Sequence, residues 1–176
     1  MSTAVIGLCS DIPQAEMVVN GLKSSGFINN DISILMPDAN NYRTAGFEKH
    51  SKAPEGISTG ASTGAVLGGA FGWLVGAGML AVPGLGPAIA AGPVMAALSG
   101  AAVGGAIGGV SGGLVGMGIP EIEAKQYEGR VIDGGKILIA VHTDNVDQVK
   151  VAENIFKNAK ANEINCVTEE KVEQRS

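Results

Sequence analysis

The residues that could take part in chemistry are few in this sequence, and they are scattered along it. Two histidines, His50 and His142, and two cysteines, Cys9 and Cys166, occur among 176 residues. Zinc sites bring their ligands in closely spaced pairs, and these four residues show no such spacing. A solvated or capping role is favoured for His142. We expect no metal, no cofactor and no catalytic residue.

A glycine-rich stretch invites comparison with phosphate-binding loops. The loop pattern GxxxxGK[ST] requires a lysine, and the chain has none between Glu55 and Glu121. The GxGxxG pattern fails as well, because Gly84 and Gly86 are followed by Pro87, which has no amide proton to donate. Nucleotide binding by this stretch is not predicted.

The most informative feature is a set of glycines at four-residue spacing, in two files. Residues four apart lie above one another on a helix, so each file forms a groove where another backbone can approach closely. We predict these glycines as oligomerisation residues. The files are Gly56, Gly60, Gly64, Gly68, Gly72 and Gly76, then Gly100, Gly104, Gly108, Gly112 and Gly116.

Such helices need packing partners. Each glycine costs a helix about 0.8–1 kcal/mol relative to alanine, so both files together cost on the order of 10 kcal/mol. A four-residue step also overshoots one helical turn by about 40°, so the groove winds around the helix. One straight partner helix cannot follow that groove. Contact with several neighbours can, and this predicts a homo-oligomer.

Charge and composition exclude some partners. The chain carries 12 basic and 17 acidic residues, with a net charge of −5, and this mild acidity argues against nucleic acid. The chain begins with a strand-like run instead of a charged leader and cleavage site, so a secreted protein is not expected. Two cysteines fit a reducing cytoplasm. We expect a cytoplasmic protein, or one at the cytoplasmic face of the inner membrane with an inserted hairpin.

The chain outside the glycine-rich stretch predicts alternating strands and helices. The strands are expected at 3–9, 31–36, 136–142 and 163–168. The helices are expected after Asp11, at 119–133 and from a cap at Asn145 or Asp144 to about Ala161. In the last helix Val146, Val149, Ala152, Ile155 and Phe156 form the expected inner face.

This order predicts a ferredoxin-like α/β sandwich, an α+β fold in which a four-stranded antiparallel sheet carries helices on one face. Residues 1–55 and 119–176 supply its two halves, and 56–118 form an insertion. The first and last strands would be neighbours, so Cys9 and Cys166 could lie close, although a pair of buried reduced thiols is favoured. Tyr127 is expected to pack its helix on the sheet or on the base of the insertion.

The insertion is predicted to be a hydrophobic helical hairpin. Its arms would run over about 58–81 and 88–118, joined by a turn at 82–87 that holds two prolines and two glycines, with a break at Gly92–Pro93. Each arm is long enough to cross about 30 Å of hydrocarbon. We expect the insertion to be separable, so that deleting 57–118 leaves a folded domain.

Two stretches carry a resemblance to a known family. They are AVPGLGPAIAAGP at 81–93 and GIPEIEAKQYEGRVIDGGKILIAVHT at 118–143. With the βαβ half before them, they resemble the bacterial general stress protein 17M-like family of heat- or low-temperature-induced proteins. The resemblance implies a stress-related bacterial protein without established enzymatic activity.

Three functions remain open from the sequence. The first is a non-enzymatic, membrane-associated homo-oligomer whose hairpins enter the lipid bilayer, because 56–118 carries no charged residue. The second is a soluble structural assembly whose hairpins pack together away from lipid, because alanine and glycine make weakly hydrophobic arms. The third is a ligand-sensing module built on the sheet.

Overall fold

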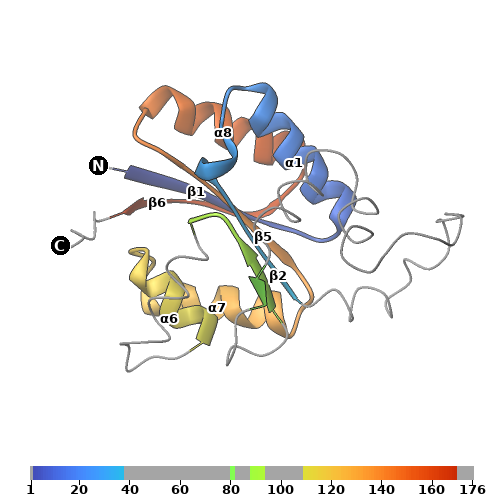
Figure 1. Ribbon diagram of the computed structural model, residues 1–176, viewed down its shortest axis with the longest axis vertical. Coiled ribbons are helices and arrows are strands. Elements are labelled where there is room, and N and C mark those ends of the chain that lie inside the picture. Colours follow the sequence, from blue (N-terminus) through green and yellow to red (C-terminus); the bar gives the residue numbers. More distant parts are fainter. Residues whose placement is uncertain (1, 38–79, 82–87, 94–108, 170–176) are drawn as a thin grey trace, which may run out of the picture.

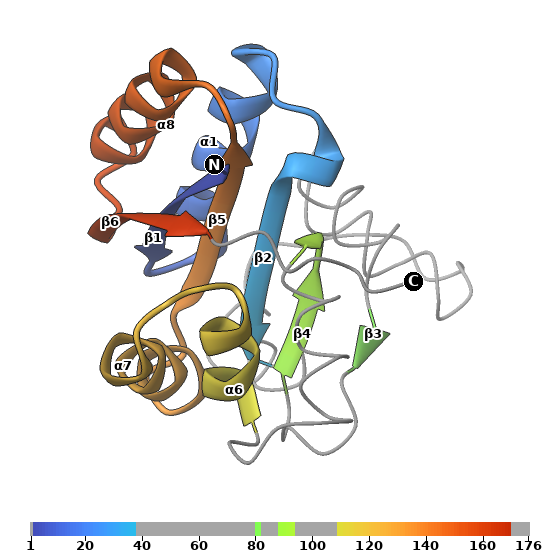
Figure 2. The ribbon, with the colours of Figure 1, turned by 90° about the vertical axis from the view of Figure 1, so that its left-hand side faces the viewer.

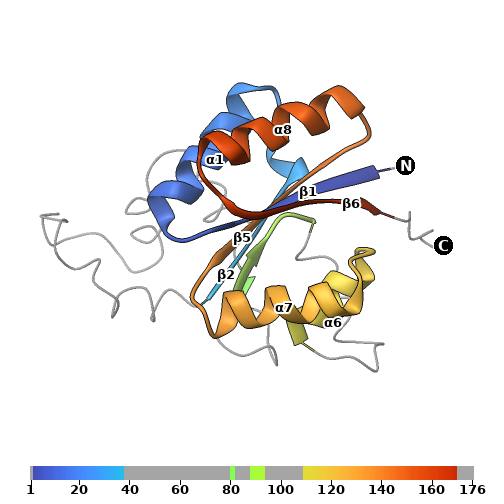
Figure 3. The same cartoon turned by 180° about the vertical axis from the view of Figure 1, so that it is seen from behind.

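A sheet between two pairs of helices forms the body of the protein (Figures 1 and 3). The computed structural model describes residues 2–37, 80–81, 88–93 and 109–169. Helices α1 and α8 cover one face of the sheet, and α6 and α7 cover the other. The strands are β1 (Ser2–Cys9), β2 (Ile32–Pro37), β3 (Leu80–Ala81), β4 (Ala88–Ala91), β5 (Ile137–Thr143) and β6 (Asn162–Glu169). The helices are α1 (Ile12–Ser24), the 3₁₀ turn η1 (Asn29–Asp31), α6 (Gly109–Gly116), α7 (Glu121–Ile132) and α8 (Val146–Asn158).

The sheet has the order β3-β4-β2-β5-β1-β6, and all neighbouring strands are antiparallel. In the middle of the sheet Val5 lies opposite Val141 on one side and Cys166 on the other. The four longer strands therefore follow the order β2-β5-β1-β6, with α1 and α8 on one face. This arrangement is compatible with the ferredoxin-like α+β fold expected from the sequence.

Alternate residues of β1 and β5 enter two separate cores, because side chains alternate across a strand. Val5 and Ile139 belong to the core under α1 and α8, which we call the α1/α8 core. Ile6 and Leu138 belong to the core under α6 and α7, the α6/α7 core. Both strands are thus buried on both faces, which explains why their sequences are continuous apolar runs.

Local signals define α1 well. The Asp11 side chain accepts a hydrogen bond of 2.8 Å from the Gln14 backbone N–H and caps the first turn. At the other end Gly26 has φ +94°, and the Phe27 N–H donates to the Leu22 carbonyl at 3.1 Å. This closing pattern ends the helix with a glycine in the left-handed region. The predicted start of this helix after Asp11 is confirmed.

Helix α6 ends in the same way as α1, where the chain turns toward α7. Gly118 has φ +91°, and the Ile119 N–H donates to the Leu114 carbonyl at 3.1 Å. Pro120 then stands at the N-cap of α7, where its missing N–H costs nothing. Because Ile119 is buried in the α6/α7 core, the turn holds the two helices against the same face of the sheet.

Two expectations about the helices are corrected. Helices cover both faces of the sheet instead of one, because α7 buries Ala124, Tyr127 and Val131 against the second face. In α8, Val146 is 71% exposed and does not belong to the inner face. Val146 occupies the first position of the helix, and the apolar residues that pack on the sheet come later in α8.

The expected helical arms are wrong at two places. Leu80–Ala81 and Ala88–Ala91 are strands β3 and β4, and β4 pairs with β2 so that Ala90 lies opposite Leu35. The turn at 82–87 was expected at the far end of the insertion, but its flanking residues lie in the sheet. The remaining parts of the arms that fall within 58–79 and 94–108 lie outside the described residues.

The chain does break at Gly92–Pro93, but at the end of a strand instead of within a helix. Strand β4 ends at Ala91, and Gly92 has φ +79°. A Cβ atom on residue 92 would lie 2.1 Å from the carbonyl oxygen of Ile32. Only glycine allows the chain to leave β4 this close to the backbone of β2.

Candidate functional site

The predicted oligomerisation glycines are represented in the structure by Gly112 and Gly116, both in α6. The other members of the two files lie outside the described residues. These are Gly56, Gly60, Gly64, Gly68, Gly72, Gly76, Gly100, Gly104 and Gly108.

Helix α6 presents these two glycines away from the core. Val110 and Leu114, four residues apart, are completely buried under the sheet. Gly112 and Gly116 follow them by two residues, or about 200° around the helix, which places them on the opposite side. Gly116 is exposed, and a Cβ atom added there would meet no atom within 4 Å. The outward side of α6 is therefore a smooth strip of backbone.

Apolar residues continue this strip into the connection with α7. Met117 is half-buried, Pro120 is exposed, and Ile122 is 75% exposed at the start of α7. Residues 56–120 carry no charge in the sequence, so this corner is where the charge-free segment ends at the surface. We call Gly112, Gly116, Met117 and Ile122 the α6 surface.

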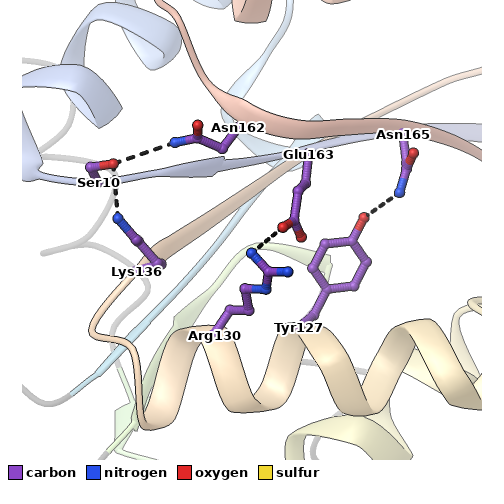
Figure 4. Close-up of polar contacts among 7 residues, drawn as sticks. All are labelled: Ser10, Tyr127, Arg130, Lys136, Asn162, Glu163 and Asn165. Carbon is purple, nitrogen blue, oxygen red and sulfur yellow. Dashed lines mark hydrogen bonds and ion pairs between the residues drawn. The ribbon is translucent and has the colours of Figure 1, made fainter.

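A row of polar contacts joins α7 to β6 (Figure 4). The Asn165 side-chain amide donates to the Tyr127 hydroxyl at 2.8 Å, and Arg130 forms an ion pair with Glu163. Burial raises the pKa of Tyr127. Tyr127 thus packs its helix on the sheet, as expected, and its hydroxyl anchors the last strand as well.

A second group of polar contacts lies at the end of β1 (Figure 4). The hydroxyl of Ser10 accepts hydrogen bonds from Lys136 Nζ at 3.0 Å and from Asn162 Nδ2 at 3.4 Å. The Ser10 backbone N–H donates to Gln14 Oε1 at 2.7 Å. Sequence reasoning missed the contacts of Ser10 with Lys136 and Asn162, because they join segments more than 100 residues apart.

His142 is half-buried, and its ring contacts the neighbouring strand. Its Nε2 lies 2.9 Å from the hydroxyl oxygen of Ser33, which is completely buried in the neighbouring strand β2. A serine hydroxyl can donate or accept, so this contact suits either tautomer of the ring. The pair joins β2 to β5 across the sheet. His50, the other histidine, lies outside the described residues.

The two cysteines are free and do not pair. Strands β1 and β6 are antiparallel neighbours, as predicted, but Cys166 lies opposite Val5, four residues from Cys9. Cys9 is buried and Cys166 is exposed, so only one of the expected buried thiols is buried.

Both thiols are poor nucleophiles. Burial, with a smaller effect of Asp11, raises the pKa of the Cys9 thiol to about 12. Partial burial and a hydrogen bond to Glu153 raise the pKa of Cys166 to about 11. Reactive cysteines have lowered pKa values, so neither thiol is prepared for catalysis.

Within residues 2–37, 80–81, 88–93 and 109–169, no group of three or more His, Cys, Asp or Glu side chains is placed to hold a metal ion. In the same part of the chain no helix has both the length and the apolar character that crossing a bilayer requires. Gly84, Gly86 and Pro87, considered for phosphate binding, lie outside it.

Comparisons of the chain with protein-family models, with curated proteins and with solved structures found no match. The resemblance to the general stress protein 17M-like family therefore remains an expectation from the sequence.

Proposed function

We propose that this chain is a non-enzymatic protein that self-associates through its glycine-rich segment. The observation that carries the proposal is the orientation of α6. Val110 and Leu114 anchor the helix in the core, while Gly116 is exposed with open space around it and Gly112 is half-buried on the same side. A glycine that served only the fold would be expected at a close approach or at positive φ, and Gly116 has neither.

The cost of glycine in a helix supports the same proposal. An exposed helical glycine is less favourable than alanine by about 1 kcal/mol, with no benefit to an isolated chain. A second backbone packed on the strip offsets that cost through close contact, as small residues do at helix interfaces. The partner in this proposal is another copy of the chain. Its proposed role in stress rests on the family resemblance alone.

The position of β3 and β4 favours assembly through contacts between protein surfaces, in preference to a hairpin inserted in lipid. Both strands are joined to the sheet through β2, and residues 82–87 lie between them in the sequence. A two-armed hairpin that crosses a bilayer would need those residues far from the sheet. One observation still favours the lipid-inserted form: residues 56–118 carry no charge.

The experiment that tests the proposal compares two leucine substitutions. Gly116→Leu adds a large side chain to the α6 surface, where there is open space in the monomer. Gly129→Leu is the matched control in α7, where the nearest atom to an added Cβ is 4.0 Å away. We expect Gly116→Leu to shift the protein to a smaller species in sizing and crosslinking, and Gly129→Leu to leave the assembly unchanged.

Flotation with liposomes separates the two settings of this assembly. A large particle that stays with the protein fraction, with or without detergent, supports contacts between protein surfaces. Protein that floats and falls apart in detergent supports the lipid-inserted form. A monomer in every condition would overturn self-association itself.

A further inference from the structure

Strand β6 is an open edge of the sheet. Among the residues that the structure describes it has one partner strand, β1, and it lies outermost on its side (Figure 2). The opposite edge is β3, which has 2 residues, whereas β6 has 8. The outward N–H and C=O groups of an edge strand can pair with another strand, so β6 is where the sheet can be extended.

Only part of β6 is regular. The stretch Asn165–Glu169 pairs continuously with Ile6–Ser2, and the register shifts beyond Ile6. Before that stretch, Glu163 has φ +51°, which is outside the extended region. The regular stretch contains neither lysine nor proline, the residues that commonly protect an edge strand from pairing. Asn165, Cys166 and Thr168 are exposed on it.

We propose that β6 pairs with β6 of a second copy, antiparallel and centred on Val167, so that the two sheets become one. A two-fold axis perpendicular to the sheet keeps each face continuous, because opposed residues then have the same parity. In this register Val167 lies opposite its own counterpart. Cys166 lies opposite Thr168, and Asn165 opposite Glu169, in each half of the contact.

The alternative registers are less favourable. Centring the pair on Cys166 would bring residue 163 opposite residue 169 twice, and the left-handed backbone of Glu163 does not fit a paired strand. Centring it on Asn165 would require Glu163 to pair, and its left-handed backbone prevents that. The register centred on Val167 pairs all five regular residues and needs no residue that lies outside the extended region.

This contact lies on a different element from the α6 surface and adds a second interface to the proposed self-association. The β6 contact is two-fold and closed, so by itself it gives a dimer. Contacts through α6 would then join dimers into larger particles.

The register can be tested by cysteine substitution in a Cys166→Ser background, where the remaining Cys9 is buried. Val167→Cys places two cysteines directly opposite, with Cβ atoms about 4.5–5.5 Å apart, and mild oxidation should join them as a disulfide. Thr168→Cys places them diagonally, about 7–8 Å apart. We expect a short bismaleimide to join the Thr168→Cys copies and oxidation to leave them separate.

Equal disulfide formation at both positions would overturn the register. The absence of crosslinks at both, with circular dichroism showing folded protein, would overturn the β6 contact. If Val167→Cys fails to fold, the bismaleimide reaction of Thr168→Cys decides alone. Adding Gly116→Leu distinguishes the two interfaces, because it should reduce particle size and leave the β6 crosslink intact.

Discussion

Gly92 and Ile32 approach each other so closely that a Cβ atom on residue 92 would lie 2.1 Å from the Ile32 carbonyl oxygen. The contact lies where the chain leaves β4, one residue after the strand that pairs with β2. The glycine-rich segment is thus tied to the sheet by a backbone contact that no other residue type permits.

Gly92→Ala should lower the free energy of unfolding by about 2–4 kcal/mol, because it adds a backbone clash to the strain of a non-glycine residue at positive φ. Gly26→Ala is the control, since Gly26 has φ +94° with open space around it. It should cost only about 1–2 kcal/mol. Urea unfolding measures the loss of stability in both variants. Equal losses would show that the backbone near Ile32 can move aside without a cost in free energy.

Gly7→Ala should destabilise the α1/α8 core, because the new Cβ would lie 2.5 Å from the Phe156 ring. Overpacking of this kind costs about 1–3 kcal/mol. Phe156→Leu makes room at the same place, so the double variant should lose less than the sum of the single losses. A thermodynamic cycle from urea unfolding checks this, and strictly additive losses would contradict the contact.

Gln14→Ala should lower stability by about 1–3 kcal/mol, because the side chain joins the start of α1 to the end of α8. Its amide nitrogen donates to the carbonyls of Ala159 at 2.8 Å and Lys160 at 2.7 Å. Lys160 has φ +58°, so its carbonyl is held where a helix has already ended. Gln126→Ala, an exposed position in α7, is the control and should change stability by less than about 0.5 kcal/mol.

Stability should fall as pH rises above 9, and Cys9 should account for much of the change. The pKa of its thiol rises from the usual 9.0 to about 12 in the fold, so the folded state holds the proton more tightly. A raised pKa contributes stability that is complete below pH 9 and is lost as pH rises toward 12. Tyr127 and Cys166 also have raised pKa values and add to the same trend.

Urea midpoints at pH 8, 9 and 10 measure this dependence, with circular dichroism to follow unfolding. Cys9→Ala removes one titrating group, so its midpoint should fall less steeply than that of the natural chain. If the urea midpoints of the two proteins fall equally steeply with pH, Cys9 does not control the loss of stability at alkaline pH.

Deleting 57–118 should unfold the protein, which reverses the expectation from the sequence. The deleted segment supplies Ala90, Val110 and Leu114 to the α6/α7 core. Without them one face of β1 and β5 loses part of its cover. Leu114→Ala tests the same point more gently and should cost about 2–5 kcal/mol. Val115→Ala, at a half-buried neighbour, should cost less. A folded deletion protein by circular dichroism would show that the core does not need α6.

Local signals in the sequence were sufficient for the elements outside 56–118. An N-cap aspartate and a closing glycine define α1, Asn145 caps α8, and apolar β-branched runs mark β1 and β5. These signals act within a few residues, so they can be read without the fold. The antiparallel sheet followed from their order.

The sequence by itself determined these elements and the lack of charge between Glu55 and Glu121. Only the tertiary structure decided that α7 closes a second core, that Leu80–Ala81 and Ala88–Ala91 join the sheet, and that Gly116 faces outward. Glycine and alanine have little local preference for one face, and a short Ala-rich run fits a strand edge as well as a helix. Contacts between distant segments made that choice, because burial and backbone pairing depend on neighbours that the local sequence does not contain.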